Sequence, residues 1–375
     1  MFIYAVKIFS ALLHLILIFS LSAISATSLG RYSFFIAIIT LISQMVMFEG
    51  AQHAIAKKIK LDDFYSYYFC NSFLWCSSIL TVFFLIKEDP LALIFTSIFI
   101  LNLTIEKLIN IITLKNRINK DDLNYKRLFN LKIIIFEILL PLIFILNIEQ
   151  FQNTFNFSIL FISLSTLLTF FIIIFAHKNK AYPRIMSTRL FSGIVYKKMD
   201  GLFIRLFTGY FWGFTSLGTI QPALSVARSI VIVTPLWINL NLNSFFTSSV
   251  KKLSIRNFIW IPLSYFAYAL ISIIMWNLLQ IININDFTYS VLLLAFLWFG
   301  NANTKSIIRA ISVFNGFLET NNNSLIVSLA FKFLIAFFIP NGAFFELFIL
   351  LISIDFIVIA IFLFLLLNKE PSHNE

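Results

Sequence analysis

Long apolar runs separated by short polar stretches make up almost the whole of this 375-residue chain. A helix that crosses a bilayer needs about 20 mostly apolar residues. By that measure the pattern predicts about twelve spans, and we expect an all-α polytopic membrane protein. The predicted spans are 4–24, 32–48, 65–86, 91–114, 130–147, 157–176, 200–217, 220–243, 257–280, 287–317, 324–339 and 343–367.

The composition agrees with this pattern. Hydrophobic residues form 60% of the chain and charged residues only 12%, whereas a soluble domain averages about 45–50% and about 25%. No polar stretch is long enough to form a separate soluble domain. The first 30 residues resemble a signal peptide, but the rest of the chain is equally apolar, so we expect an uncleaved first span.

The basic residues of the predicted connections lie almost all on one side of the membrane. If alternate connections face the cytoplasm, the outer ones hold only Arg31 and Lys87. Lys and Arg concentrate in cytoplasmic loops, so we expect both termini in the cytoplasm. The same bias explains the net charge of +11 without nucleic acid. The basic inner segments are 57–60, 115–132, 178–198 and 251–256.

The tetrapeptide Thr-Ser-Leu-Gly occurs twice, at 27–30 and at 215–218, half a chain length apart. Placement at half the length favours an internal repeat, although recurrence by chance is the alternative. Each copy follows one apolar run and precedes another. We therefore expect it at the outer end of the first helix of each half, with Gly30 and Gly218 in tight turns where a missing Cβ is useful.

The longest inner connection, 177–199, is the natural seam between the two halves. It interleaves basic and apolar residues after Pro183, a pattern typical of a short interfacial helix. We predict an N-terminal six-helix lobe over 1–180, a cytoplasmic linker helix over 181–199 and a C-terminal six-helix lobe over 200–375. An even number of spans gives both halves the same topology, as in transporters with parallel repeats.

Several charged side chains fall inside the predicted spans, and the basic ones outnumber the acidic ones. Each costs about 2.5–3.5 kcal/mol at the centre of a membrane helix, so such groups usually face a wet cavity or a partner. Ion pairs between Lys107 and Glu137, and between Lys332 and Asp355, are the structural alternative to a functional role. The charged residues concerned are Glu106, Lys107, Glu137, Arg205, Arg228, Lys305, Arg309, Lys332 and Asp355.

Arg205 and Arg228 are the least explained by pairing, and we predict that they line a cavity. Lys305 and Arg309 follow a polar break at 301–304. Either they line the cavity too, or the tenth span ends early and leaves them in the cytoplasm. A cationic cavity favours an anionic solute or headgroup, and Arg binds phosphate in a bidentate way.

We therefore predict a substrate-binding set of cationic residues and a set of acidic residues that couple transport to an ion. No carboxylate pair, Ser/His/Asp cluster or metal-ligating motif occurs, so we expect neither an enzyme nor a metal or cofactor. Cys70 and Cys76 lie in one apolar run and are expected to be buried thiols. The cationic set is Arg205, Arg228, Lys305, Arg309 and Lys332, and the acidic set is Glu106, Glu137 and Asp355.

Four stretches carry a resemblance to a known family. Residues 28–33 (Ser-Leu-Gly-Arg-Tyr-Ser), 48–51 (Phe-Glu-Gly-Ala), 198–202 (Lys-Met-Asp-Gly-Leu) and 216–218 (Ser-Leu-Gly) are similar to segments of the polysaccharide-repeat exporters. This is the O-antigen flippase (Wzx-like) branch of the multidrug/oligosaccharidyl-lipid/polysaccharide superfamily. The chain departs from the family at Thr219, where a Tyr usually follows the second Gly, and in its short outer loops.

The resemblance implies two six-helix lobes around a central cavity. It implies a flippase that moves an undecaprenyl-diphosphate-linked oligosaccharide across the bacterial inner membrane by alternating access. The oligosaccharide would be an O-antigen or other surface polysaccharide repeat unit. Polysaccharide polymerase and chain-length proteins would be its partners. Two alternatives are a multidrug/cation antiporter, which would favour an acidic cavity, and a membrane polysaccharide polymerase, which usually carries a large outer loop. Here the longest predicted outer loop is 147–156.

Overall fold

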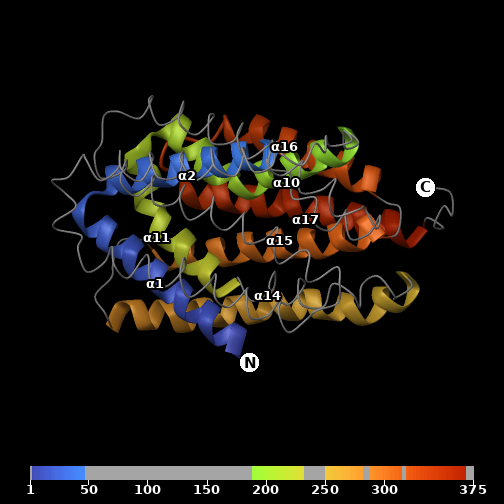
Figure 1. The fold of residues 1–375 in the computed structure, drawn as a ribbon, viewed down its shortest axis with the longest axis horizontal. Coiled ribbons are helices and arrows are strands. Elements are labelled where there is room, and N and C mark those ends of the chain that lie inside the picture. Colours follow the sequence, from blue (N-terminus) through green and yellow to red (C-terminus); the bar gives the residue numbers. More distant parts are fainter. Residues whose placement is uncertain (1, 47–187, 232–249, 282–287, 315–317, 369–375) are drawn as a thin grey trace, which may run out of the picture. The chain divides into compact units, whose positions relative to one another are not determined.

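A computed structural model describes residues 2–46, 188–231, 250–281, 288–314 and 318–368 (Figure 1). Within these ranges the secondary structure is helical, and no strand occurs in them. The described part of the chain therefore belongs to the all-α class, as the apolar pattern predicts.

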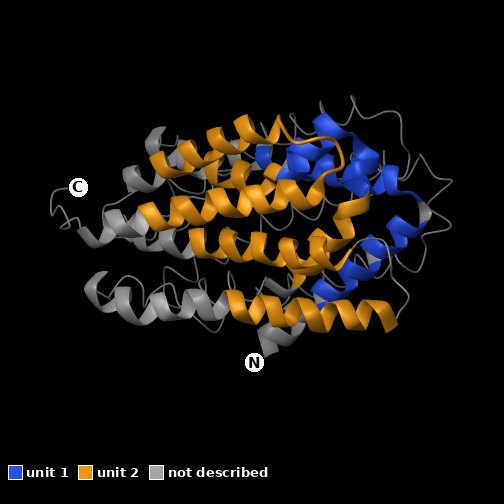
Figure 2. Ribbon diagram, turned by 180° about the vertical axis from the view of Figure 1, so that it is seen from behind, with its two compact units in different colours: residues 1–187, 204–218 blue, residues 188–203, 219–375 orange. Residues whose placement is uncertain are grey.

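The chain divides into two compact units, 1–187 with 204–218, and 188–203 with 219–375 (Figure 2). The first contains α1 (Phe2–Ile24), α2 (Ala26–Val46) and a π-helical turn, η2 (Thr208–Trp212). The second contains α14 (Val250–Ile281), α15 (Tyr289–Phe314), α16 (Leu318–Ala336) and α17 (Phe344–Asn368). Helices α10 (Thr188–Phe207) and α11 (Phe214–Val231) contribute to both. The predicted lobe boundaries remain a prediction.

Two helix pairs repeat each other along the chain. Only Ser25 separates α1 from α2, and only Gly213 separates η2 from α11. These two breaks lie the same 188 residues apart as Thr27 and Thr215. Ser25 caps α2, because its Oγ accepts a hydrogen bond from the Ser28 amide at 3.2 Å. Gly213 turns the chain with a φ of +88°, which an L side chain rarely adopts.

The breaks correct the predicted place of the tetrapeptide. Gly30 and Gly218 are each the fifth residue of a helix, α2 and α11 respectively, and do not lie in tight turns. The boundaries of the seventh and eighth predicted spans were also misplaced. The predicted span 200–217 contains the break at Gly213, and its helix already begins at Thr188, so residues 188–199 of the predicted linker belong to α10. Hydropathy cannot locate a break made by one left-handed glycine.

Helix α15 is the centre of the second unit, where it packs against α14, α16 and α17. Its residues Leu292, Ala295 and Phe296 are fully buried. Facing residues of α17, Leu347 and Phe348, are buried as well. Close packing of such side chains holds these helices together through many small dispersion contacts.

Among the described helices, one contains a stretch long and apolar enough to cross a membrane by length and composition. It is the 18-residue segment Phe344–Ile361 of α17. Shorter apolar segments occur at Tyr265–Ile281 and Asn323–Ala336. The predicted total of about twelve spans remains a prediction.

Candidate functional site

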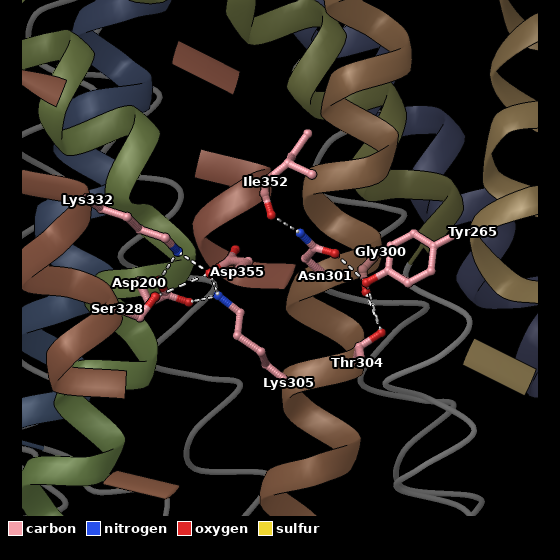
Figure 3. A network of polar contacts seen from close by, with 10 residues as sticks. All are labelled: Asp200, Tyr265, Gly300, Asn301, Thr304, Lys305, Ser328, Lys332, Ile352 and Asp355. Atoms are coloured by element: carbon pink, nitrogen blue, oxygen red, sulfur yellow. Dashed lines mark hydrogen bonds and ion pairs between the residues drawn. The ribbon is translucent and has the colours of Figure 1, made fainter. Parts of the chain in front are cut away.

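Four charged side chains from four helices meet in the interior of the second unit (Figure 3). Asp200 comes from α10, Lys305 from α15, Lys332 from α16 and Asp355 from α17. Their side chains are 5%, 10%, 0% and 1% exposed, respectively. We call these four residues the charge cluster.

Each lysine of the charge cluster bridges both carboxylates. Lys305 Nζ donates to Asp200 Oδ2, and to Asp355 Oδ1 at 2.8 Å. Lys332 Nζ donates to Asp200 Oδ1 and lies 2.6 Å from Asp355 Oδ1. The cluster is thus a closed ring of alternating charges that connects α10, α15, α16 and α17.

Neighbouring residues fix the geometry of this ring. Ser328, one helical turn before Lys332, donates to Asp355 Oδ1 at 3.3 Å. The indole of the buried Trp298 lies 4.6 Å from Lys332 Nζ and 5.6 Å from Lys305 Nζ, measured to a ring centroid. An ammonium over an indole face gains a further cation–π attraction.

The rings of Phe203 and Phe333 hold α10 against α16 beside the cluster. Their centroids lie 4.8 Å apart in an edge-to-face arrangement. Phe203 follows Asp200 by three residues, and Phe333 is next to Lys332. This apolar contact therefore sets the distance between the two charged side chains that its helices carry.

The charge cluster has a formal charge of zero when all four groups are ionised. Removing one member of a buried ion pair leaves an uncompensated charge and costs about 3–5 kcal/mol. The two lysines therefore do not give the positive excess that an anion-binding role requires, because two carboxylates already neutralise them. One acceptor is left over: among the described residues, no group donates to the buried Oδ2 of Asp355.

A second set of polar contacts continues along α15. Tyr265 of α14 donates to Asn301 Oδ1 and lies 3.3 Å from Thr304 Oγ1. The Asn301 amide donates to the Ile352 carbonyl of α17 at 3.3 Å. Asn303 donates to Tyr268 Oη at 3.3 Å.

These contacts correct the predicted polar break at 301–304. The segment lies within α15, which continues to Phe314. Its polar side chains are satisfied by neighbouring helices and do not end the helix. Lys305 accordingly belongs to the buried charge cluster, and not to a cytoplasmic end of the span. Arg309 lies on α15, but its side chain is outside the described residues.

The structure places the remaining predicted site residues as follows. The predicted ion pair between Lys332 and Asp355 is confirmed at 2.6 Å. Arg205 is buried at the end of α10 and has interaction partners. Arg228 is exposed on α11 and also has partners. Lys107 and the predicted ion-coupling residues Glu106 and Glu137 lie outside the described residues.

Asp200 is the site residue that the sequence did not identify as a partner of the lysines. It lies beside Lys197 and Lys198, so it resembles the end of a charged linker. Its pairing with Lys305 and Lys332 spans 105 and 132 residues of sequence. The excess of basic over acidic residues in the predicted spans was the signal that another carboxylate was required.

A second arrangement lies in the first unit, where the two copies of the tetrapeptide touch each other. Thr27 Oγ1 lies 3.0 Å from Thr215 Oγ1. A Cβ added to Gly30 would fall 1.7 Å from the Phe214 carbonyl oxygen, and one added to Gly218 would fall 1.8 Å from that of Ala26. We call the contact between 26–30 and 214–218 the helix crossing.

The helix crossing is reciprocal. Gly30 meets residue 214, and its repeat equivalent Gly218 meets residue 26, the equivalent of residue 214. Contacts in which residue i meets j, and the equivalent of j meets the equivalent of i, are characteristic of a two-fold axis. Gly30 and Gly218 let the helix backbones approach closely, as small residues do in membrane helix pairs. The local axis passes between Thr27 and Thr215.

Comparisons with known proteins give no relative: no protein-family model, curated protein or solved structure matches this chain. In the part of the chain that the structure describes, no group of three or more His, Cys, Asp or Glu is arranged to hold a metal ion.

Proposed function

We propose that the chain is a polytopic membrane transporter of about twelve spans, arranged as two six-helix lobes around a central cavity. The observation that carries this proposal is the reciprocal helix crossing. Two helix pairs with equivalent breaks at Ser25 and Gly213 meet at equivalent residues. A local two-fold axis between halves of equal topology is the architecture of transporters built from parallel repeats.

The cargo that we propose is an undecaprenyl-diphosphate-linked oligosaccharide, moved from the inner to the outer leaflet of a bacterial inner membrane. The segments that resemble polysaccharide-repeat exporters support this cargo. A diphosphate-sugar headgroup cannot cross hydrocarbon unaided, because buried unpaired charge and unsatisfied hydroxyl groups cost many kcal/mol. A wet, cationic passage between the lobes removes that cost while the polyprenyl tail stays in lipid.

The charge cluster guides our choice of the basic residues that we propose for binding the diphosphate. Lys305 and Lys332 are neutralised inside the charge cluster, so we assign them to holding α10, α15, α16 and α17 together. Arg228 has an exposed side chain and a guanidinium that suits phosphate. We propose Arg228 as the first contact for the headgroup, with Arg205 and Arg309 as further members of the cationic set.

Among the three carboxylates predicted to couple transport to an ion, Asp355 is the one within the described residues. Its Oδ2 accepts no hydrogen bond from the described residues. The ion pairs of Asp355 with Lys305 and Lys332 favour a structural role for it, and the coupling role of Glu106, Glu137 and Asp355 stays a prediction.

The test is complementation of the producing bacterium after deletion of the gene. The proposal predicts that lipid-linked oligosaccharide accumulates in the deletion strain with its headgroup accessible only from the cytoplasmic side. The intact gene restores surface glycan. Normal surface glycan in the deletion strain, with no other exporter induced, contradicts the proposal.

Arg228→Ala supplies the residue-level test in the same strain. Loss of one hydrogen bond to a charged group costs about 1.5–3 kcal/mol, which is about tenfold or more in affinity. We expect a corresponding fall in the rate of export while the variant still inserts into the membrane. Arg228→Lys is the control, because it keeps the charge and restores part of the rate. Unchanged export by both Arg228→Ala and Arg205→Ala contradicts the cationic passage.

A further inference from the structure

In the helix crossing the two backbones lie closer together than is needed to form the hydrogen bond between Thr27 and Thr215. Leu29 and its repeat equivalent Leu217 are both fully buried. The carbonyl oxygens of Ala26 and Phe214 lie where a Cβ on the opposite glycine would be. The two helix backbones are therefore in direct contact at these positions.

Aromatic rings extend the closure along one side of the crossing. The Phe214 ring lies 5.5 Å from that of Phe34 and 6.2 Å from that of Phe35, measured between centroids. The guanidinium of Arg31 lies 5.6 Å from the centroid of the Phe214 ring. Gly209 lets Phe34 approach, since a Cβ there would be 2.5 Å from that ring.

The local two-fold symmetry of the helix crossing indicates its role in transport. A contact between equivalent residues lies on the axis that relates the two halves. In a transporter of parallel repeats, the cargo passes between the halves along the same axis. A contact on the axis therefore obstructs the path, whereas a hinge that only supports a rocking motion lies beside it.

We propose that the helix crossing is a gate that closes one end of the transport path, with the Thr27–Thr215 bond as its latch. This inference rests on the proposed transport function. The contact is suited to repeated opening, because Thr27 and Thr215 share a neutral hydrogen bond and neither tetrapeptide contains a charged residue. Separation of the two first turns exposes Leu29 and Leu217 to water.

The first test locks the gate. Thr27→Cys and Thr215→Cys are combined in a chain that carries Cys70→Ser and Cys76→Ser, and membranes are oxidised with copper phenanthroline. Because the two hydroxyl oxygens lie 3.0 Å apart, we expect a disulfide in high yield. The cross-linked chain exports glycan at least about tenfold more slowly, and reduction restores the rate. If the fully cross-linked chain exports glycan as fast as the chain whose disulfide has been reduced, the gate is overturned.

The second test needs no cargo, so that it separates the gate from the proposed function. A chain with Leu217→Cys as its single cysteine is labelled with a membrane-impermeant maleimide. Adding Gly30→Ala forces the Phe214 carbonyl away and opens the gate. We expect labelling to become about tenfold faster, which corresponds to a shift of about 1.4 kcal/mol between the closed and open states.

The control for this labelling is Gly201→Ala, because no atom lies within 4 Å of a Cβ added at that helical glycine. It should leave the rate unchanged. Equal labelling with and without Gly30→Ala in inserted chain overturns the gate. Faster labelling by Gly30→Ala, together with normal surface glycan in the gene-deletion strain, supports the gate and contradicts the flippase.

Discussion

The helix crossing and the charge cluster hold helices together by opposite means. The crossing works because side chains are missing at Gly30 and Gly218, so two backbones touch. The charge cluster works because four long or ionised side chains meet in the interior. When the helix crossing separates, it exposes apolar surfaces and hydroxyl groups that water can solvate. When the charge cluster separates, it leaves buried charges without partners.

This difference suggests which contact changes during transport. Opposite charges that are in contact in a low-dielectric interior attract each other strongly, so separating them requires much free energy. A hydroxyl pair and a few apolar contacts are cheap to separate. We therefore expect the charge cluster to stay intact through the cycle, and the crossing to open and close.

The largest effect expected is that of breaking the charge cluster on one side. Lys332→Met leaves two carboxylates with a single ammonium group, and should lower the free energy of unfolding by about 3–5 kcal/mol. Thermal unfolding of the purified protein in detergent measures it. The double variant Lys332→Met/Asp355→Asn leaves one neutral pair and should recover part of the loss. If the double variant is as unstable as the sum of both single variants, the four residues do not act as one ring.

Next in size is the crossing. Gly30→Ala and Gly218→Ala each place a Cβ within 1.8 Å of a backbone oxygen, and overpacking of this kind typically costs about 1–3 kcal/mol. The same unfolding measurement should give both variants similar losses, because each new Cβ meets the equivalent backbone carbonyl group of the other helix. Gly201→Ala is the matched control and should stabilise α10 by up to about 1 kcal/mol. Unequal losses at the two glycines contradict the local two-fold axis.

A smaller loss is expected for the polar contacts along α15. Tyr265→Phe removes the hydroxyl group that donates to Asn301 and contacts Thr304. A buried amide oxygen is then left without its donor, at a cost of about 1–2 kcal/mol. Tyr210→Phe is the control, because Tyr210 is 74% exposed. Equal stability of both variants indicates that α15 does not depend on these bonds.

The smallest effect is expected at the latch. Thr27→Val keeps the shape of the side chain and removes its hydroxyl group, so that the free energy of unfolding should fall by only about 0.5 kcal/mol. Its effect on export should run in the opposite direction, with a faster or less regulated opening. Thr27→Ser keeps the hydroxyl group and should behave like the native chain. If Thr27→Val lowers the free energy of unfolding by several kcal/mol, the Thr27–Thr215 bond is part of the stable fold and not a latch that opens.

Helices whose ends coincide with the ends of apolar runs were predictable from the sequence. The last predicted span, 343–367, differs by one residue at each end from α17, Phe344–Asn368. The pairing of Lys332 with Asp355 followed from two charges at similar depth in neighbouring spans. In both cases the information is local or lies in adjacent helices.

Features that depend on distant helices were not predictable in the same way. Hydropathy placed the seventh span across Gly213, because one positive φ leaves no trace in an apolar average. Asp200 reaches its lysines only when α10 lies beside α15 and α16, which no spacing within one segment reveals. The tetrapeptide repeat was visible, but its use as a contact depends on the two copies meeting at Thr27 and Thr215.

A cryo-electron microscopy structure of the full chain in lipid nanodiscs tests the proposed two-lobe transporter most directly. We expect a protein that crosses the bilayer with two six-helix lobes. A rotation about an axis normal to the membrane should bring Thr27 onto Thr215 and α1–α2 onto α10–α11, and the two threonines should touch in at least one state. Helix pairs that cannot be superposed in this register, or threonines that are apart in every state, contradict it.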